Sequence, residues 1–98
     1  MYFFFRLVAP RPTYHLDMSE TERAIMLQHI DYWTMLTDEG TSLLFGPVLD
    51  PKGPFGMAVM EVSSEEEAHQ LVRTDPVIAA GICTYELSPM RIGSIRKA

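Results

Sequence analysis

The sequence predicts an α+β fold in which four antiparallel strands form one sheet and two helices cover one of its faces. Three observations lead to this prediction. Aromatic and β-branched runs alternate with helix-start patterns, turns containing Gly and Pro separate neighbouring runs, and the resulting order of elements is β-α-β-β-α-β. That order is the ferredoxin-like split motif, a two-layer sandwich with both helices on one side.

The first strand and the first helix are marked most clearly. Residues 2–9 are aromatic and β-branched and predict a strand. Residues 10–18 contain two prolines and predict a loop. Ser19 with Glu22 three residues later is a capping-box pattern, so we expect a helix to begin there. It should end near Gly40, because glycine suits a helix C-terminus.

The remaining elements follow from similar signals. Ser64 with Glu67 repeats the capping-box pattern and predicts a second helix that ends near Thr74. Asp75-Pro76 interrupts the chain after it. We expect strands at residues 41–49, 55–62 and 83–92, a turn at 50–54, and one further helical turn at 77–81. Residues 93–98 should be ordered only by docking on a neighbour.

The composition predicts one domain, residues 1–98, that forms a homodimer through its sheet. Hydrophobic residues make up 47% of the chain, whereas a domain of this size buries only about two thirds of its unfolded surface. Three strand segments, "YFFF", "SLLFG" and "GMAVM", are apolar on both sides. Strands buried on two faces lose polar alternation, so the face without helices should meet a second copy.

Charge and cysteine content exclude several classes of protein. The net charge is −5 and the eight basic residues are mostly scattered, which argues against nucleic-acid binding because that requires clustered Lys and Arg. The lone cysteine, Cys83, favours a reducing compartment. No apolar run approaches the ~20 residues of a membrane span, and the N-terminus lacks the basic start of a signal peptide. We expect a cytoplasmic protein without a membrane partner.

His29 is the first candidate for chemistry. With residues placed about 100° apart on a helical wheel, it falls in the middle of the apolar arc, one turn from Ile25 and one turn from Trp33. One interpretation is a core histidine satisfied by a backbone carbonyl or a tyrosine. The other is an acid–base group in a cleft between helix and sheet, where burial disfavours the imidazolium and a nearby carboxylate favours it.

Asp75 is the candidate for that carboxylate. The wheel of the second helix places it on the apolar face with Ala68, Leu71 and Val72. Asp near the C-terminal end of a helix opposes the macrodipole. Capping of the following turn, with Pro76 in its first position, explains the residue structurally. Capping needs only one carboxylate oxygen, so the other remains available to His29.

Other candidates are predicted to line an apolar pocket. They are Trp33, Phe4, Tyr2 and Met60, each with plain core packing as its alternative. Arg6 interrupts an apolar strand, so it either holds a substrate oxyanion or carboxylate or forms an ion pair at the sheet margin. Among the other histidines, His69 is expected on the surface, and His15 is expected to be exposed or at a cleft mouth. The dispersed histidines have no metal-ligand spacing.

The segments "QHIDYWTMLTDEGTSLLFGP" and "TDPVIAAG" together resemble the YCII-related (YciI-like) family of the dimeric α+β barrel superfamily. The resemblance rests on a helix histidine, a glycine that closes the helix, a Gly-Pro that ends the second strand, and an Asp-Pro before the last strand. These are His29, Gly40, Gly46-Pro47 and Asp75-Pro76, followed by Ala80-Gly81.

The resemblance implies a ferredoxin-like subunit that dimerises through its sheets and a His29–Asp75 dyad. One branch of the family resembles muconolactone isomerases and acts as a cofactor-free dehydrochlorinase. The leading hypothesis is therefore a lyase or isomerase that uses the dyad to move a proton on a small cyclic or aromatic oxygenated compound, without cofactor or metal. The alternatives are a non-catalytic dimeric ligand-binding or interaction module, and a heme-binding or oxygenase relative with His29 as iron ligand.

Overall fold

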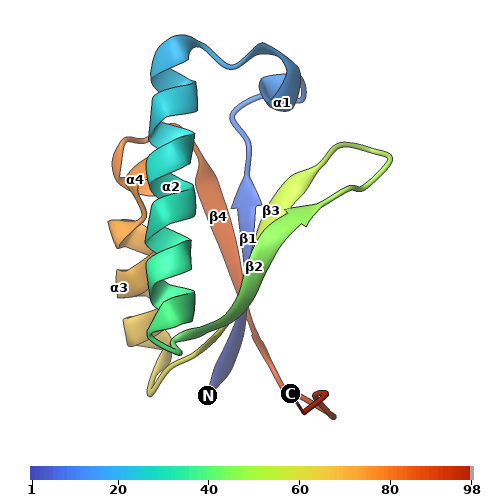
Figure 1. Ribbon diagram of the computed structural model, residues 1–98, viewed down its shortest axis with the longest axis vertical. Helices are drawn as coiled ribbons and strands as arrows, with labels where there is room; N and C mark the ends of the chain where they lie inside the picture. The colour runs from blue at the N-terminus through green and yellow to red at the C-terminus, as the bar shows by residue number, and fades with distance from the viewer. Residues whose placement is uncertain (98) are drawn as a thin grey trace.

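The computed structural model describes residues 1–97 and places them in four strands and four helices (Figure 1). The elements in chain order are β1 (Tyr2–Val8), α1 (Tyr14–Asp17), α2 (Glu20–Asp38), β2 (Ser42–Val48), β3 (Phe55–Glu61), α3 (Glu65–Thr74), α4 (Pro76–Ala79) and β4 (Thr84–Met90). The predicted α+β fold is confirmed, with each predicted strand and helix within a few residues of its expected position.

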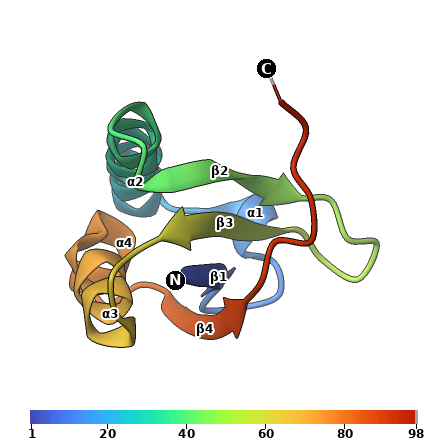
Figure 2. The ribbon, with the colours of Figure 1, turned by 90° about the horizontal axis from the view of Figure 1, so that it is seen from below.

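The strands form an antiparallel sheet in the order β2-β3-β1-β4, and α2, α3 and α4 lie along one of its faces (Figure 2). Successive side chains of a strand point to opposite faces. In β1 the buried residues are Phe3, Phe5 and Leu7. These three side chains form the floor on which the helices pack.

Helix α2 begins and ends where the sequence predicts. The Ser19 hydroxyl accepts a hydrogen bond from the Glu22 backbone N–H at 3.1 Å, and the Glu22 carboxylate accepts one from the Ser19 N–H at 2.9 Å. Gly40 follows the helix with a φ of +89°, a conformation that glycine adopts without strain. The buried residues of α2 are His29, Trp33 and Leu36, so the predicted apolar face is confirmed.

The start of α3 differs from the prediction in one bond. Ser64 accepts a hydrogen bond from the Glu67 backbone N–H at 3.1 Å, as a capping residue does. The Glu67 carboxylate, however, accepts from the hydroxyl of Ser63 at 2.9 Å and from its N–H at 3.3 Å. Ser63 offers two donors where the Ser64 backbone offers one, so the reciprocal half of the capping box forms one residue earlier.

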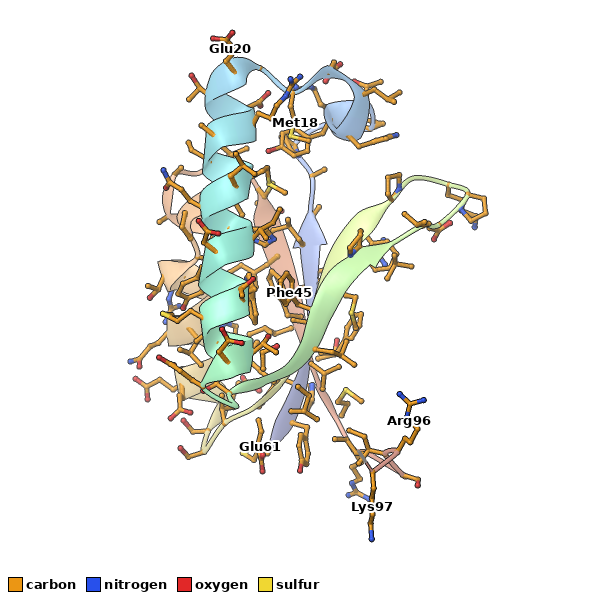
Figure 3. All side chains as sticks on the ribbon, viewed as in Figure 1. Met18, Glu20, Phe45, Glu61, Arg96 and Lys97 are labelled. Atoms are coloured by element: carbon orange, nitrogen blue, oxygen red, sulfur yellow. The ribbon has the colours of Figure 1, made fainter. Side chains whose placement is uncertain are left out.

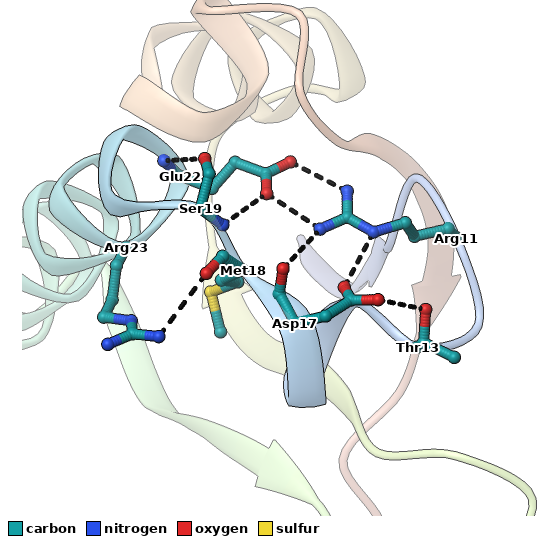
Figure 4. A network of polar contacts seen from close by, with 7 residues as sticks. All are labelled: Arg11, Thr13, Asp17, Met18, Ser19, Glu22 and Arg23. Atoms are coloured by element: carbon teal, nitrogen blue, oxygen red, sulfur yellow. Dashed lines mark hydrogen bonds and ion pairs between the residues drawn. The ribbon is translucent and has the colours of Figure 1, made fainter.

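Helix α1 lies in the region that the sequence analysis predicts as a loop. Arg11 holds it against the start of α2 (Figure 4). Its guanidinium donates to Asp17 Oδ1 at 2.8 Å and to the two carboxylate oxygens of Glu22 at 2.8 and 2.9 Å. We call these three residues the Arg11 clamp. The helix depends on this contact between segments, which explains why no local sequence pattern reveals it.

The Arg11 clamp is expected to open in acid. The Arg11 hydrogen bond, followed by the Ser19 backbone, lowers the pKa of Glu22 from 4.5 to about 2. The stabilisation is therefore fully present above pH 4.5 and is lost as the pH falls towards about 2. NMR amide shifts of residues 11–18 should then move towards random-coil values before those of β1. The expectation would be contradicted if the amide shifts of residues 11–18 and of β1 changed at the same pH. It would also be contradicted if the amide shifts of residues 11–18 did not change.

No helix within residues 1–97 covers the second face of the sheet. The strand register places a majority of apolar side chains there, including Tyr2, Phe4, Leu44, Phe55, Met57, Val59 and Met90, together with the polar side chains of Arg6, Glu61, Thr84, Glu86 and Ser88. The segment after β4 runs on this side of the molecule (Figures 1 and 2), and Arg96 and Lys97 point away from its body (Figure 3). The last residue of the predicted tail, Ala98, lies outside the described residues. None of the helices in residues 1–97 is long and apolar enough to cross a membrane.

Candidate active site

A cavity of about 230 Å³ lies between the helices α1 and α2 and the sheet. Its wall is mainly apolar and includes Phe5, Leu7, Met26, Ile30, Trp33 and Phe45. Figure 3 shows Phe45 between β2 and α2, with Met18 nearer to α1. The polar side chains of the wall are His29, Tyr14, His15 and Cys83. An apolar chamber with a few polar groups is the usual form of a small-molecule site.

His29 and Asp75 meet at this cavity although they lie 46 positions apart in the chain. His29 Nδ1 is 2.6 Å from Asp75 Oδ2. Asp75 is completely buried, whereas His29 is 7% exposed and lines the cavity. The structure therefore brings together the two residues that the sequence analysis pairs.

The Asp75 carboxylate is bound by three groups. Oδ2 lies 2.6 Å from His29 Nδ1 and accepts a hydrogen bond from Trp33 Nε1 at 2.7 Å, and Oδ1 accepts one from the Val77 backbone N–H at 3.0 Å. Indole and backbone N–H groups only donate, and an ionised carboxylate only accepts. The arrangement therefore places the hydrogen of a neutral His29 on Nδ1. Its Nε2 makes no hydrogen bond within the described chain and keeps its lone pair.

Local structure explains how these groups converge. His29 and Trp33 are four residues apart on α2 and therefore lie on the same side of the helix, which lets both reach one oxygen of Asp75. The Trp33 ring is fixed by stacking on Phe5, with the ring centroids 4.8 Å apart. Asp75 caps α4 through its other oxygen, and Pro76 begins that helix. The predicted division of the two carboxylate oxygens between capping and His29 is present.

The family model for the YCII-related domain matches residues 2–91. The chain belongs to the YCII-related family. This match covers every strand and helix described above. No curated protein sequence matches the chain.

Two solved structures share the fold of this YCII-related chain. One is 5-chloro-2-hydroxyhydroquinone dehydrochlorinase (TftG) from Burkholderia phenoliruptrix AC1100 in complex with 2,5-dihydroxybenzoquinone, with a TM-score of 0.72 and 19% identity over 95% of this chain and 96% of that one. The other is muconolactone isomerase, with a TM-score of 0.71 and 18% identity over 100% of this chain and 98% of that one. At these identities the likeness shows a shared fold.

Four residues of this YCII-related chain are predicted to line the pocket and a fifth, Arg6, to hold the substrate, and only one of the five lies in the cavity wall. Trp33 forms part of the cavity wall. Met60 lies on the helix-covered face but is packed in the core away from the cavity. Tyr2, Phe4 and Arg6 alternate with the buried residues of β1 and therefore point to the opposite face of the sheet. The prediction that these four residues belong to the pocket is corrected accordingly.

Arg6 follows the structural alternative rather than the substrate-binding one. Its guanidinium carbon lies 3.8 Å from the centroid of the Phe55 ring, and its Nε lies 3.9 Å from the carboxylate of Glu86. Both contacts are between neighbouring strands on the face without helices. A cation placed this way stabilises the sheet surface, and Arg6 is not part of the wall of the cavity beside His29.

Sequence reasoning missed two polar residues of the cavity, Tyr14 and Cys83. Tyr14 belongs to α1, which has no local signal, and Cys83 precedes β4 without a motif around it. Burial raises the pKa of the Cys83 thiol to about 11, so the thiol stays protonated and is a poor nucleophile. His69, predicted on the surface, is partly exposed outside the cavity wall, with Nδ1 2.8 Å from the Tyr85 hydroxyl.

Proposed function

We propose that the protein is a lyase or isomerase that needs no cofactor and acts on a small oxygenated ring compound. The observation that carries this proposal is the 2.6 Å contact between His29 and Asp75 on the wall of an apolar cavity. A histidine whose Nε2 is free and whose Nδ1 contacts a carboxylate is suited to general acid–base catalysis. Proton transfer of this kind is sufficient for an isomerisation or an elimination.

His29 Nε2 accepts the proton in the proposed first step. A C–H or O–H bond of the substrate breaks, its electron pair moves into the ring system, and the proton forms a bond to Nε2. The imidazolium is stabilised by the buried Asp75 carboxylate, which keeps the ring oriented. In an isomerisation His29 returns the proton to a different atom. In an elimination the electron pair expels a leaving group instead.

Cavity size and polarity support a single-ring substrate. A dry cavity of about 150 Å³ is enough to bind benzene, so 230 Å³ accommodates one ring with a few substituents. Within the described chain, no Arg, Lys, Asp or Glu is part of the wall, which favours uncharged compounds over carboxylates. The two similar structures are in keeping with a single-ring compound, since one holds 2,5-dihydroxybenzoquinone and the other is a muconolactone isomerase.

A screen of hydroxylated aromatics and lactones tests the proposed function. Wild-type protein should convert at least one member, and the conversion should require His29. Turnover that survives His29→Ala unchanged would remove the proposed mechanism. Compounds that bind without being converted would instead support the alternative function, a non-catalytic ligand-binding module.

We also propose that two copies pair through the sheet face without helices. Its apolar residues, including Phe4 and Val59 on adjacent strands, form a surface of the kind that marks an interface. Light scattering should give twice the 11.1 kDa chain mass. Val59→Lys should shift the protein towards monomer, whereas Leu27→Lys on the exposed side of α2 should not. A monomeric wild-type protein at micromolar concentration would contradict this assembly.

A further inference from the structure

Tyr14 is a cavity residue whose hydroxyl has no partner in the chain. It begins α1 and lines the same cavity as His29. The side chain is 5% exposed, and its hydroxyl is the one buried side-chain polar atom of residues 1–97 without a hydrogen bond. Buried polar groups are nearly always paired, and an unpaired one costs stability. A phenylalanine would fill the same space without that cost.

The environment of the hydroxyl makes it a hydrogen-bond donor. Burial, followed by the neighbouring Cys83, raises the pKa of Tyr14 to about 12, so the phenol keeps its hydrogen at neutral pH. The Cys83 thiol interacts with the Tyr14 hydroxyl and contributes to its raised pKa, but the contact does not have the geometry of a hydrogen bond. The group that would satisfy the hydroxyl is therefore an acceptor brought into the cavity from outside.

We propose that Tyr14 binds an oxygen atom of the ring substrate and so orients the ring against His29. The substrate class is narrowed to rings that carry a carbonyl or phenolic oxygen, and hydrocarbon rings are excluded. The identity of the ligand as a substrate rests on the proposed function, whereas the binding role of Tyr14 does not. The two groups come from different walls of the cavity, Tyr14 from α1 and His29 from α2.

The Tyr14 hydroxyl would also assist the proposed proton transfer. When a ring C–H bond breaks and its proton moves to His29 Nε2, the released electron pair can settle on a conjugated ring oxygen. A hydrogen bond from Tyr14 to that oxygen is stronger once the oxygen carries negative charge, so the bond favours the transition state over the ground state.

The ligand reaches the hydroxyl through a small adjustment of its surroundings. The hydroxyl is covered, so α1 or a neighbouring side chain has to shift. Met18 and Met26 also line the cavity, and methionine side chains change conformation at low cost. The Arg11 clamp holds helix α1 through the ion pair between Arg11 and Asp17, and this pair lies at the surface. Pairs of this kind are weak enough to allow such a movement.

Calorimetry with two probe ligands of similar size tests the role of Tyr14. Hydroquinone carries oxygen acceptors and toluene carries none. Tyr14→Phe should weaken hydroquinone binding by about 3- to 10-fold, the effect of losing one hydrogen bond, and should leave toluene binding unchanged. The thermal stability of Tyr14→Phe should equal or exceed that of wild type, because the substitution removes an unpaired group.

Tyr32→Phe is the matched control. The Tyr32 hydroxyl donates to the Leu71 carbonyl at 2.6 Å and lies outside the cavity wall. Its removal should lower thermal stability and leave the affinity for both probes unchanged. Equal weakening of both probes by Tyr14→Phe, unchanged hydroquinone affinity, or a wild-type protein that binds neither probe would overturn the proposal. Binding is measured without turnover, so failure of the substrate screen is distinguishable from each of these results.

Discussion

Asp75→Ala is expected to lower the free energy of unfolding by about 3–5 kcal/mol, because each buried donor left without its acceptor costs about 1–3 kcal/mol. The carboxylate satisfies His29, the indole of Trp33 and the backbone N–H of Val77. Alanine leaves all three buried groups without their acceptor and also removes the cap of α4. Urea denaturation monitored by circular dichroism measures the change.

Asp75→Asn separates the two roles of this carboxylate. The asparagine oxygen can still accept a hydrogen bond, so the loss of stability should be smaller than with alanine. An amide nitrogen in the place of Oδ2 would donate to His29, which moves the imidazole hydrogen to Nε2 and removes the free lone pair, and it would leave the Trp33 N–H without an acceptor. We therefore expect Asp75→Asn to lose less stability than Asp75→Ala and to lose most of the activity. Comparable losses of stability in both variants would contradict the carboxylate network.

His29→Ala is expected to reduce the turnover number by about 10²- to 10⁴-fold, the usual contribution of a positioned general acid or base. The fold should persist, because Asp75 keeps its hydrogen bonds from Trp33 and Val77. The substitution enlarges the cavity beside Asp75, so added imidazole should restore part of the activity. Steady-state kinetics on a compound found in the screen measures both effects.

His69→Ala is the control for His29→Ala. His69 also contacts a polar partner, Tyr85, but it lies outside the cavity wall. Its removal should leave the turnover number within about twofold, as for a surface substitution away from the site. Similar losses in the two variants, or activity of His29→Ala that imidazole does not change, would contradict a proton-transfer role specific to His29.

Capping patterns and helical periodicity identified the two candidate residues, and the resemblance to the YCII-related family implied that they form a dyad. The Ser19–Glu22 pattern fixed the start of α2, and the wheel placed His29 beside Trp33 on its buried face. Asp75 was identifiable because a carboxylate at the end of one apolar helix face needs a partner. These signals are local, so a single sequence contains them.

The remaining features of the site depend on information that is not local. Strand β1 is apolar on both faces, so its sequence does not reveal that Phe5 faces the cavity and Phe4 faces away. Helix α1 depends on a hydrogen bond between Arg11 and Glu22, eleven positions apart. Tyr14 was missed for the same reason. Its importance becomes visible only once its hydroxyl is seen to be buried without a partner.

The position of the hydrogen on the His29 ring is the most direct test of the site chemistry. A ¹⁵N–¹H correlation spectrum of the imidazole side chains distinguishes the two neutral forms, and hydroquinone can be added to the same sample. We expect the hydrogen on Nδ1 and a shift of the Nε2 signal when the ligand binds, with His69 unaffected. A hydrogen on Nε2 would contradict the proposal that His29 Nε2 acts as the base. Unchanged His29 ring signals with a ligand bound in the cavity would contradict it as well.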